Sequence, residues 1–215
     1  MEYRFLHLKF PASNTFVELR SIIASIDLRS IGISEWGVFH GVFGLATNEL
    51  YWVLHGDLDA STSNTDNLVK FDDIVRRLTD ADVLIIDQKR FKPTVRPLEH
   101  IARTASGVYV FRWFDVNESD VDEIAALSKE AWNTFEAGFD TEVQGLFAEA
   151  GLKEGSNEEL SDGRETMLLV TWYRDLAVWQ DSREPHPKAR ELFLKRHGLM
   201  KEAKPIATRL IPRGT

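Results

Sequence analysis

The chain of 215 residues contains no cysteine, so it can form no disulfide, thiolate metal site or cysteine nucleophile. It also lacks an excess of positive charge, because 26 Lys and Arg face 34 Asp and Glu for a formal net charge of −8. A dedicated nucleic-acid binder needs clustered basic side chains for the phosphates, so we expect no nucleic-acid partner. No apolar run approaches the roughly 20 residues of a spanning helix, so we expect no membrane partner either.

Several familiar signatures are also missing. The six histidines are scattered, with no HxH or HExxH pair, and we therefore expect no metal site. The chain has no Walker loop, no GxGxxG after a strand and no GxSxG elbow, so no motif names a cofactor or a catalytic residue. The first residues, MEYRFLHLKFP, show no basic segment followed by a long apolar one. We therefore predict a cytoplasmic protein that binds no cofactor.

What the sequence does contain is a repeated order of elements, centred on the strand and turn of Leu168–Trp179 and a weaker copy at Leu50–Asp57. Apolar periodicity and turn residues predict strand, helix, strand, strand, helix, strand in each half. In the first half the predicted strands are Glu2–Phe10, Glu35–Leu45, Leu50–His55 and Val83–Ile86, and the helices begin at Thr15 and span Asn67–Thr79. In the second half the predicted strands are Gly107–Phe114, Thr141–Ala148, Thr166–Arg174 and Ala203–Ile211, with helices over 119–138, Leu176–Arg183 and Lys188–His197.

This order predicts an α+β fold of two tandem ferredoxin-like (βαββαβ) repeats. We assign residues 1–97 to the first repeat, 98–106 to a linker and 107–215 to the second repeat. Three matches support duplication: Tyr3 with Tyr109, the Gly41 step with the Gly145 step (GVF with GLF), and Asp57-Leu58 with Asp175-Leu176.

A four-stranded sheet with helices on one side leaves an apolar face that another layer must cover. Two such sheets can cover each other, which gives an α+β barrel with the helices outside and an interior between the two sheets. Whether the barrel closes within one chain or between the two chains of a homodimer stays open at this point.

Strand alternation gives candidates for a small-molecule pocket. In EVQGLF it places Val143, Gly145 and Phe147 on one face and Glu142, Gln144 and Leu146 on the other. Polar groups fit a ligand cavity better than a helix layer. The repeat alignment places His40 on the same face as Gln144. It also places His55 and Tyr173 at matching positions near the ends of the third strand of each half. The candidate pocket-lining residues are His40, His55, Arg112, Glu142, Gln144 and Tyr173.

Each candidate also has a structural interpretation. A strand histidine can be a buried structural residue rather than a base. Arg112 and Glu142 can form an internal ion pair, and Tyr173 can pack with its hydroxyl in water.

The second half resembles the NIPSNAP family. The residues that carry the resemblance are Val108–Phe114 (VYVFRWF), Gly145–Phe147, Trp172–Glu184 (WYRDLAVWQDSRE) and Arg209–Pro212. In the first half, LHGDL at 54–58 stands where the family has Tyr-Arg-Asp-Leu, so the Tyr and Arg are lost there. The resemblance implies the dimeric α+β barrel fold and little chemistry. The wider superfamily includes cofactor-independent monooxygenases, haem-binding enzymes and isomerases, whose catalytic residues do not carry over to this chain.

We therefore expect a NIPSNAP-like protein that binds a small apolar or aromatic molecule in a pocket of the α+β barrel. One alternative is a monooxygenase- or isomerase-like enzyme, in which a His or Arg stabilises developing negative charge. Another is a scaffold module whose interior is filled, with no cavity of a few hundred cubic ångströms. A haem-binding protein would need His40 or His55 as axial ligand in an apolar slot.

Overall fold

The computed structural model describes residues 1–56, 65–150 and 163–213, and its chain divides into two compact units. Unit 1 comprises Met1–Phe91, His100–Ala105 and Thr208–Thr215, and unit 2 comprises Lys92–Glu99 and Ser106–Ala207. The predicted match of Asp57-Leu58 lies outside the described residues. The α+β class predicted from the sequence is confirmed, since both units have the order β-α-β-β-α-β of ferredoxin-like repeats.

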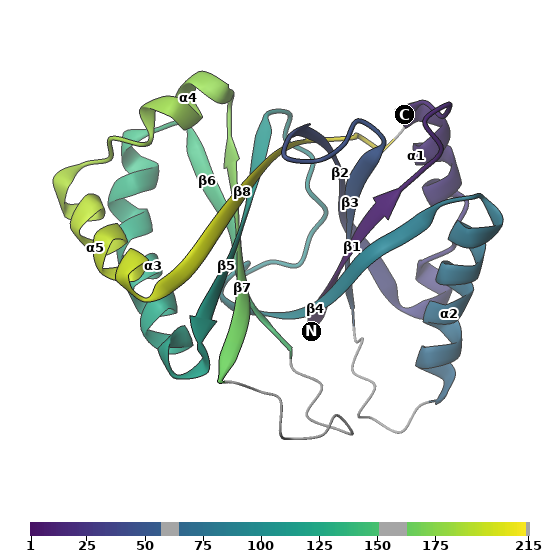
Figure 1. The fold of residues 1–215 in the computed structure, drawn as a ribbon, viewed down its shortest axis with the longest axis horizontal. Helices are drawn as coiled ribbons and strands as arrows, with labels where there is room; N and C mark the ends of the chain where they lie inside the picture. Colours follow the sequence, from purple (N-terminus) through teal and green to yellow (C-terminus); the bar gives the residue numbers. More distant parts are fainter. Residues whose placement is uncertain (57–64, 151–162, 214–215) are drawn as a thin grey trace. The chain divides into compact units, whose positions relative to one another are not determined.

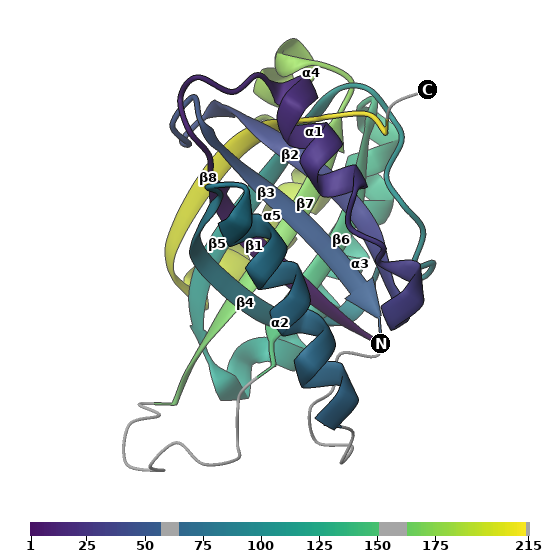
Figure 2. The same ribbon diagram turned by 90° about the vertical axis from the view of Figure 1, so that its right-hand side faces the viewer.

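Unit 1 is an antiparallel sheet with two helices on one face. Its elements are β1 (Glu2–Lys9), α1 (Phe16–Ala24), the 3-10 turn η1 (Arg29–Ile31), β2 (Ile33–Phe43), β3 (Glu49–Gly56), α2 (Thr65–Asp80) and the first part of β4 (Leu84–Arg96). β1 pairs with both β3 and β4, and β3 pairs with β2. Figures 1 and 2 show α1 and α2 on the same side of these strands.

Helix α1 begins at a capping box, as its sequence predicts. The Thr15 side chain accepts a hydrogen bond from the Glu18 backbone, and Glu18 bonds back to the Thr15 backbone. Its inward residues Leu19 and Ile23 are buried against Trp52 of β3 and other apolar side chains of the sheet. This core fixes the position of α1, and with it the start of the loop that follows.

Unit 2 repeats the plan. Its elements are β5 (Val108–Asn117), the 3-10 turn η2 (Glu118–Asp120), α3 (Val121–Gly138), β6 (Thr141–Glu149), β7 (Arg164–Tyr173), α4 (Leu176–Asp181), α5 (Pro187–Gly198) and β8 (Met200–Leu210). β7 pairs antiparallel with β5 and β6, and α3 packs against α5. The predicted break between α4 and α5 is confirmed. Helix α5 starts at Pro187, and the N–H that proline lacks would have no partner within the helix at this first position.

Strand β4 extends well beyond the predicted strand, Val83–Ile86. The strand runs through Pro93 to Arg96. In unit 2 the Thr94 hydroxyl donates to the Leu146 carbonyl at 2.8 Å, and Arg96 donates to the Val143 carbonyl at 3.1 Å. These side-chain contacts hold the segment beside β6 despite the proline.

A β-bulge in each unit corrects the predicted faces and the predicted repeat alignment. The register shifts between Glu35 and Gly37 in β2 and between Val143 and Gly145 in β6. Because a bulge adds one residue, Val143 and Leu146 lie together in the helix-side core instead of on opposite faces.

The equivalent steps are therefore Gly37-Val38-Phe39 and Gly145-Leu146-Phe147, not Gly41-Val42-Phe43. In both, a Cβ on the glycine would lie 2.4–2.5 Å from the ring of the phenylalanine two residues on. Tyr3 pairs with His55 and Tyr109 with Trp172, which confirms the tyrosine match and makes Trp172, not Tyr173, the counterpart of His55.

Candidate functional site

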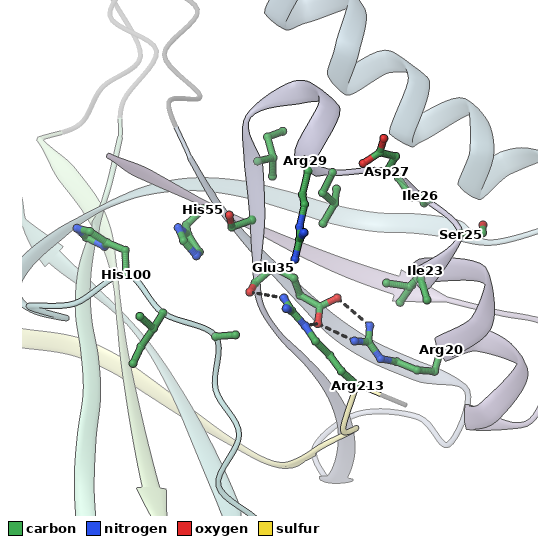
Figure 3. A pocket seen from close by; sticks show the side chains of 16 residues that line it. Arg20, Ile23, Ser25, Ile26, Asp27, Arg29, Glu35, His55, His100 and Arg213 are labelled. Atoms are coloured by element: carbon green, nitrogen blue, oxygen red, sulfur yellow. Dashed lines mark hydrogen bonds and ion pairs between the residues drawn. The ribbon is translucent and has the colours of Figure 1, made fainter. Parts of the chain in front are cut away.

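A cavity of about 610 Å³ lies in unit 1 where β2 begins and β3 ends (Figure 3). The loop after α1 forms one wall, because Gly32 turns the chain in the left-handed region at φ 70° and feeds it into β2. The segment 100–102 and Arg213 form other parts of the wall. Residues far apart in the sequence therefore meet at one end of a single sheet.

A buried carboxylate holds one side of this cavity. Glu35 is 7% exposed and accepts two hydrogen bonds from the Arg20 guanidinium, at 2.7 and 2.8 Å. Arg213 adds a third at 2.9 Å, and the indole N–H of Trp52 a fourth at 3.3 Å. Four donors satisfy the carboxylate, and two guanidinium groups around one acid leave an excess of positive charge. We interpret this network as the rigid wall of the site rather than its reacting group.

His55, from the end of β3, is the cavity group whose bonding is incomplete. It is 6% exposed, and its Nδ1 is buried without a hydrogen-bond partner in the described structure. Burial lowers the pKa of His55 to about 4, with further lowering from the charges of His100, Arg103 and Arg213. The imidazole is therefore neutral at pH 7, and a neutral ring nitrogen can accept a proton or a hydrogen bond.

Tyr3 and His100 support His55 from one side. The Tyr3 ring lies 5.5 Å from the His55 ring, and its hydroxyl lies 2.8 Å from His100 Nδ1. Burial raises the pKa of Tyr3 well above its ordinary value, although the charge of Arg103 opposes the shift. Tyr3 therefore keeps its phenolic proton at pH 7 and shares this hydrogen bond with His100.

Arg29 provides a free cation. Its guanidinium points into the cavity between His55 and Glu35 (Figure 3). It makes no ion pair or side-chain hydrogen bond with the part of the chain that the structure describes. An unpaired guanidinium beside a neutral imidazole is an arrangement that can hold a developing oxyanion.

The predicted pocket residues lie at different places. His55 lines the unit 1 cavity, whereas Arg112 and Tyr173 line a second cavity of about 600 Å³ in unit 2. His40 faces the helix layer, with its ring 4.4 Å from that of Phe16 in α1, contrary to the face predicted for it.

The remaining two candidates, Glu142 and Gln144, line neither cavity. Glu142 is exposed. Gln144 is buried and donates to the Glu142 carbonyl at 3.4 Å. Among described residues the predicted Arg112–Glu142 ion pair is therefore not formed.

Sequence reasoning missed most of the unit 1 site. The residues it missed are Tyr3, Arg20, Arg29, Glu35, His100 and Arg213. One signal was available, since Arg20 sits beside Leu19 and three residues before Ile23 on the inward face of α1. An arginine on an apolar face needs a buried acid, and Glu35 is that acid.

The described residues that line the unit 1 cavity do not have the features of a metal or haem site. No group of three or more His, Asp or Glu in the described ranges is arranged to hold a metal ion. A haem bound through His55 would need an apolar slot for its macrocycle. This cavity is instead lined by Arg29, Glu35 and other charged side chains. The residues present do not fit haem. No described helix is long and apolar enough to cross a membrane.

No protein-family model matches the chain, and no curated protein matches it in sequence. Solved structures match in fold. A chlorite dismutase variant from Candidatus Nitrospira defluvii aligns with a TM-score of 0.59 at 9% identity, over 99% of this chain and 91% of that one. An anthrone oxidase-like protein aligns with a TM-score of 0.57 at 12% identity, over 100% and 94%.

Two further matches cover almost all of both chains. A candidate monooxygenase from Lactobacillus acidophilus NCFM aligns with a TM-score of 0.53 at 13% identity, over 99% and 97%. A DypB variant from Rhodococcus jostii RHA1, solved in complex with heme, aligns with a TM-score of 0.55 at 11% identity, over 99% and 93%. At such identities the likeness establishes the fold, which is that of dimeric α+β barrel proteins.

Proposed function

We propose that this is a NIPSNAP-like α+β barrel protein that binds a small aromatic or apolar molecule with a weakly acidic O–H or C–H group in the unit 1 cavity. The resemblance of residues 107–212 to the NIPSNAP family supports the first part of the proposal. The cavity of about 610 Å³ supports the second part. A scaffold with a filled interior is disfavoured by a cavity of this size.

The single observation that carries the proposal is the buried, unpartnered Nδ1 of His55. Leaving a polar atom buried without a partner costs about 1–3 kcal/mol, so it normally has a reason. A ligand O–H donating to this nitrogen would remove that cost. Ile23, Ile26 and Ile33 line the same cavity and can contact an apolar ligand body.

A second candidate function is acid–base catalysis of the kind that cofactor-independent monooxygenases or isomerases use. Neutral His55 can take the proton of the ligand, and the Arg29 guanidinium can stabilise the phenolate or enolate that remains. The names of the anthrone oxidase-like protein and the candidate monooxygenase fit this chemistry. The feature that favours it here is an unprotonated base close to a guanidinium that has no ion-pair partner within the described ranges.

A chromogenic phenol tests the binding proposal. At pH 6, 4-nitrophenol in water is mostly protonated and nearly colourless, whereas its phenolate is yellow. Binding next to the Arg29 guanidinium should lower the pKa of the bound phenol by about one unit or more, so adding protein should produce the phenolate band.

The variants His55→Phe and Arg29→Met should each abolish most of this band. Arg174→Met is the matched control, because Arg174 is exposed and pairs with Asp140 and Asp175 in unit 2. 4-Nitroanisole, which has no proton to lose, controls for changes of solvent environment. An unchanged spectrum with wild-type protein, or an equal band with His55→Phe, would contradict the proposal.

A further inference from the structure

The second cavity, of about 600 Å³, lies within unit 2 and has an aromatic wall. Trp132 and Phe135 of α3, Trp179 of α4 and Phe193 of α5 all line it. Cavities of this size with several aromatic walls are typical of small-molecule sites.

The charge around this cavity has one sign only. Arg112, Arg183, Arg190, Arg196 and one histidine line it, and no Asp or Glu of the described chain does. This is unexpected for a protein whose formal net charge is −8. A cavity lined by arginines and, within the described ranges, by no carboxylate has a local environment suited to an anion.

Arg196 is the strongest feature of the cavity. It is 8% exposed, its Nε is buried without a partner, and its guanidinium donates to the Ser128 hydroxyl at 3.2 Å. Its guanidinium carbon lies 4.8 Å from the centre of the Phe193 ring. No carboxylate balances this buried charge in the described structure.

The second arginine, Arg112, lies near Arg196 and has no acidic partner among the described residues. Burial lowers the pKa of Arg196 to about 9, and the charge of Arg112 lowers it further, while Tyr173 opposes the shift. Arg196 therefore still carries a proton at pH 7. Two close guanidinium groups without a counter-charge repel each other, and an anion between them would remove that repulsion.

We propose that the unit 2 cavity binds an organic anion, a carboxylate on an aromatic or similarly apolar body, with the carboxylate held by Arg112 and Arg196. Guanidinium groups match the planar geometry of a carboxylate and can donate two parallel hydrogen bonds to it. The apolar body lies against Trp132 and Phe193. This site is separate from the unit 1 cavity, and neither proposal depends on the other.

The choice of an organic acid over a bare anion follows from the walls. A small inorganic anion would contact the guanidinium groups and leave the aromatic surface unused. A body of one or two rings would cover that surface and exclude water from the charge pair. The proposal therefore predicts selectivity for both parts of the ligand.

Calorimetric titration with 2-naphthoate, 2-naphthylmethanol and inorganic phosphate tests this selectivity. We expect 2-naphthoate to bind wild-type protein about tenfold to a hundredfold more tightly than the neutral alcohol, because the alcohol cannot pair with the arginines. Phosphate should compete only weakly. Equal affinity for the acid and the alcohol, or phosphate binding as tight as naphthoate binding, would overturn the proposal.

Variants locate the bound acid. Arg196→Met and Arg112→Met should each reduce the preference for the acid, whereas Arg196→Lys should retain part of it. Arg174→Met, which removes an exposed guanidinium paired with Asp140 and Asp175, should leave it unchanged. A preference lost in Arg29→Met and kept in Arg196→Met would place the acid in the other cavity and refute the inference. Circular dichroism checks that each variant is folded.

Discussion

His55 makes a prediction about stability that is independent of any ligand. Its folded pKa of about 4 lies below the ordinary value of 6.5, so between these values the unfolded chain binds a proton that the native protein does not. The contribution of His55 to stability is therefore most favourable above pH 6.5 and falls as the pH decreases toward 4. Between pH 7 and pH 5 the expected loss from this one residue is about 2 kcal/mol.

The perturbation that isolates this effect is His55→Phe. The phenyl ring keeps the aromatic contact with Tyr3 and removes both the titrating group and the unpartnered nitrogen. We expect the variant to be at least as stable as wild type at pH 5, although it should lose binding of 4-nitrophenol. A substitution that stabilises the protein and abolishes binding is the behaviour expected of a functional residue.

The assay is urea unfolding at pH 7, 6 and 5, followed by circular dichroism and fluorescence. Restricting the range to pH 5 and above limits protonation of carboxylates. For each protein, the quantity to measure is the loss in the free energy of unfolding between pH 7 and pH 5. The loss in wild type should exceed the loss in His55→Phe by about 2 kcal/mol. If the two proteins lose equal stability between pH 7 and pH 5, the assignment of a neutral, buried His55 is wrong.

Three further predictions concern stability. Gly145→Ala should cost about 1–3 kcal/mol, because its methyl group would meet the buried Phe147 ring at 2.4 Å, whereas Gly138→Ala, with no atom within 4 Å, should be within about 0.5 kcal/mol of wild type in the same denaturation assay. Arg20→Met should cost about 3–5 kcal/mol by leaving Glu35 poorly paired, and a double variant with Glu35→Leu should recover part of the loss; a larger loss in the double variant would contradict this. Thr15→Ala should lower stability by about 1 kcal/mol through loss of the α1 cap, and thermal unfolding with no change in midpoint would show that the cap contributes nothing.

The order of elements was predictable from the sequence because it depends on local signals. The capping box at Thr15, the prolines before α5 and the apolar periodicity of α3 each act within a few residues. The two bulges were not predictable in this way. A bulged strand and a regular one have the same composition, and the extra residue is recognised only from its partner strand.

The unit 1 site was hidden for a different reason. Glu35 is bonded by Arg20 and Arg213, which lie 15 and 178 positions away, and Tyr3 meets His100 at a separation of 97. No periodicity links such residues. His55 was identified because it falls at the end of a strong strand pattern, whereas His100 lies in a segment with no pattern at all.

The segment Thr208–Thr215 belongs to unit 1 although it begins within β8, most of which belongs to unit 2, and this arrangement has a consequence for protein synthesis. In unit 1 the Ile211 amide donates to the Val38 carbonyl at 2.8 Å, and Arg213 completes the ring of donors around Glu35. A ribosome makes β1 to β3 early, but the cavity wall beside them is finished only after Arg213 has emerged. Nascent chains should therefore complete the wall of the unit 1 cavity last, although most of unit 1 is translated first.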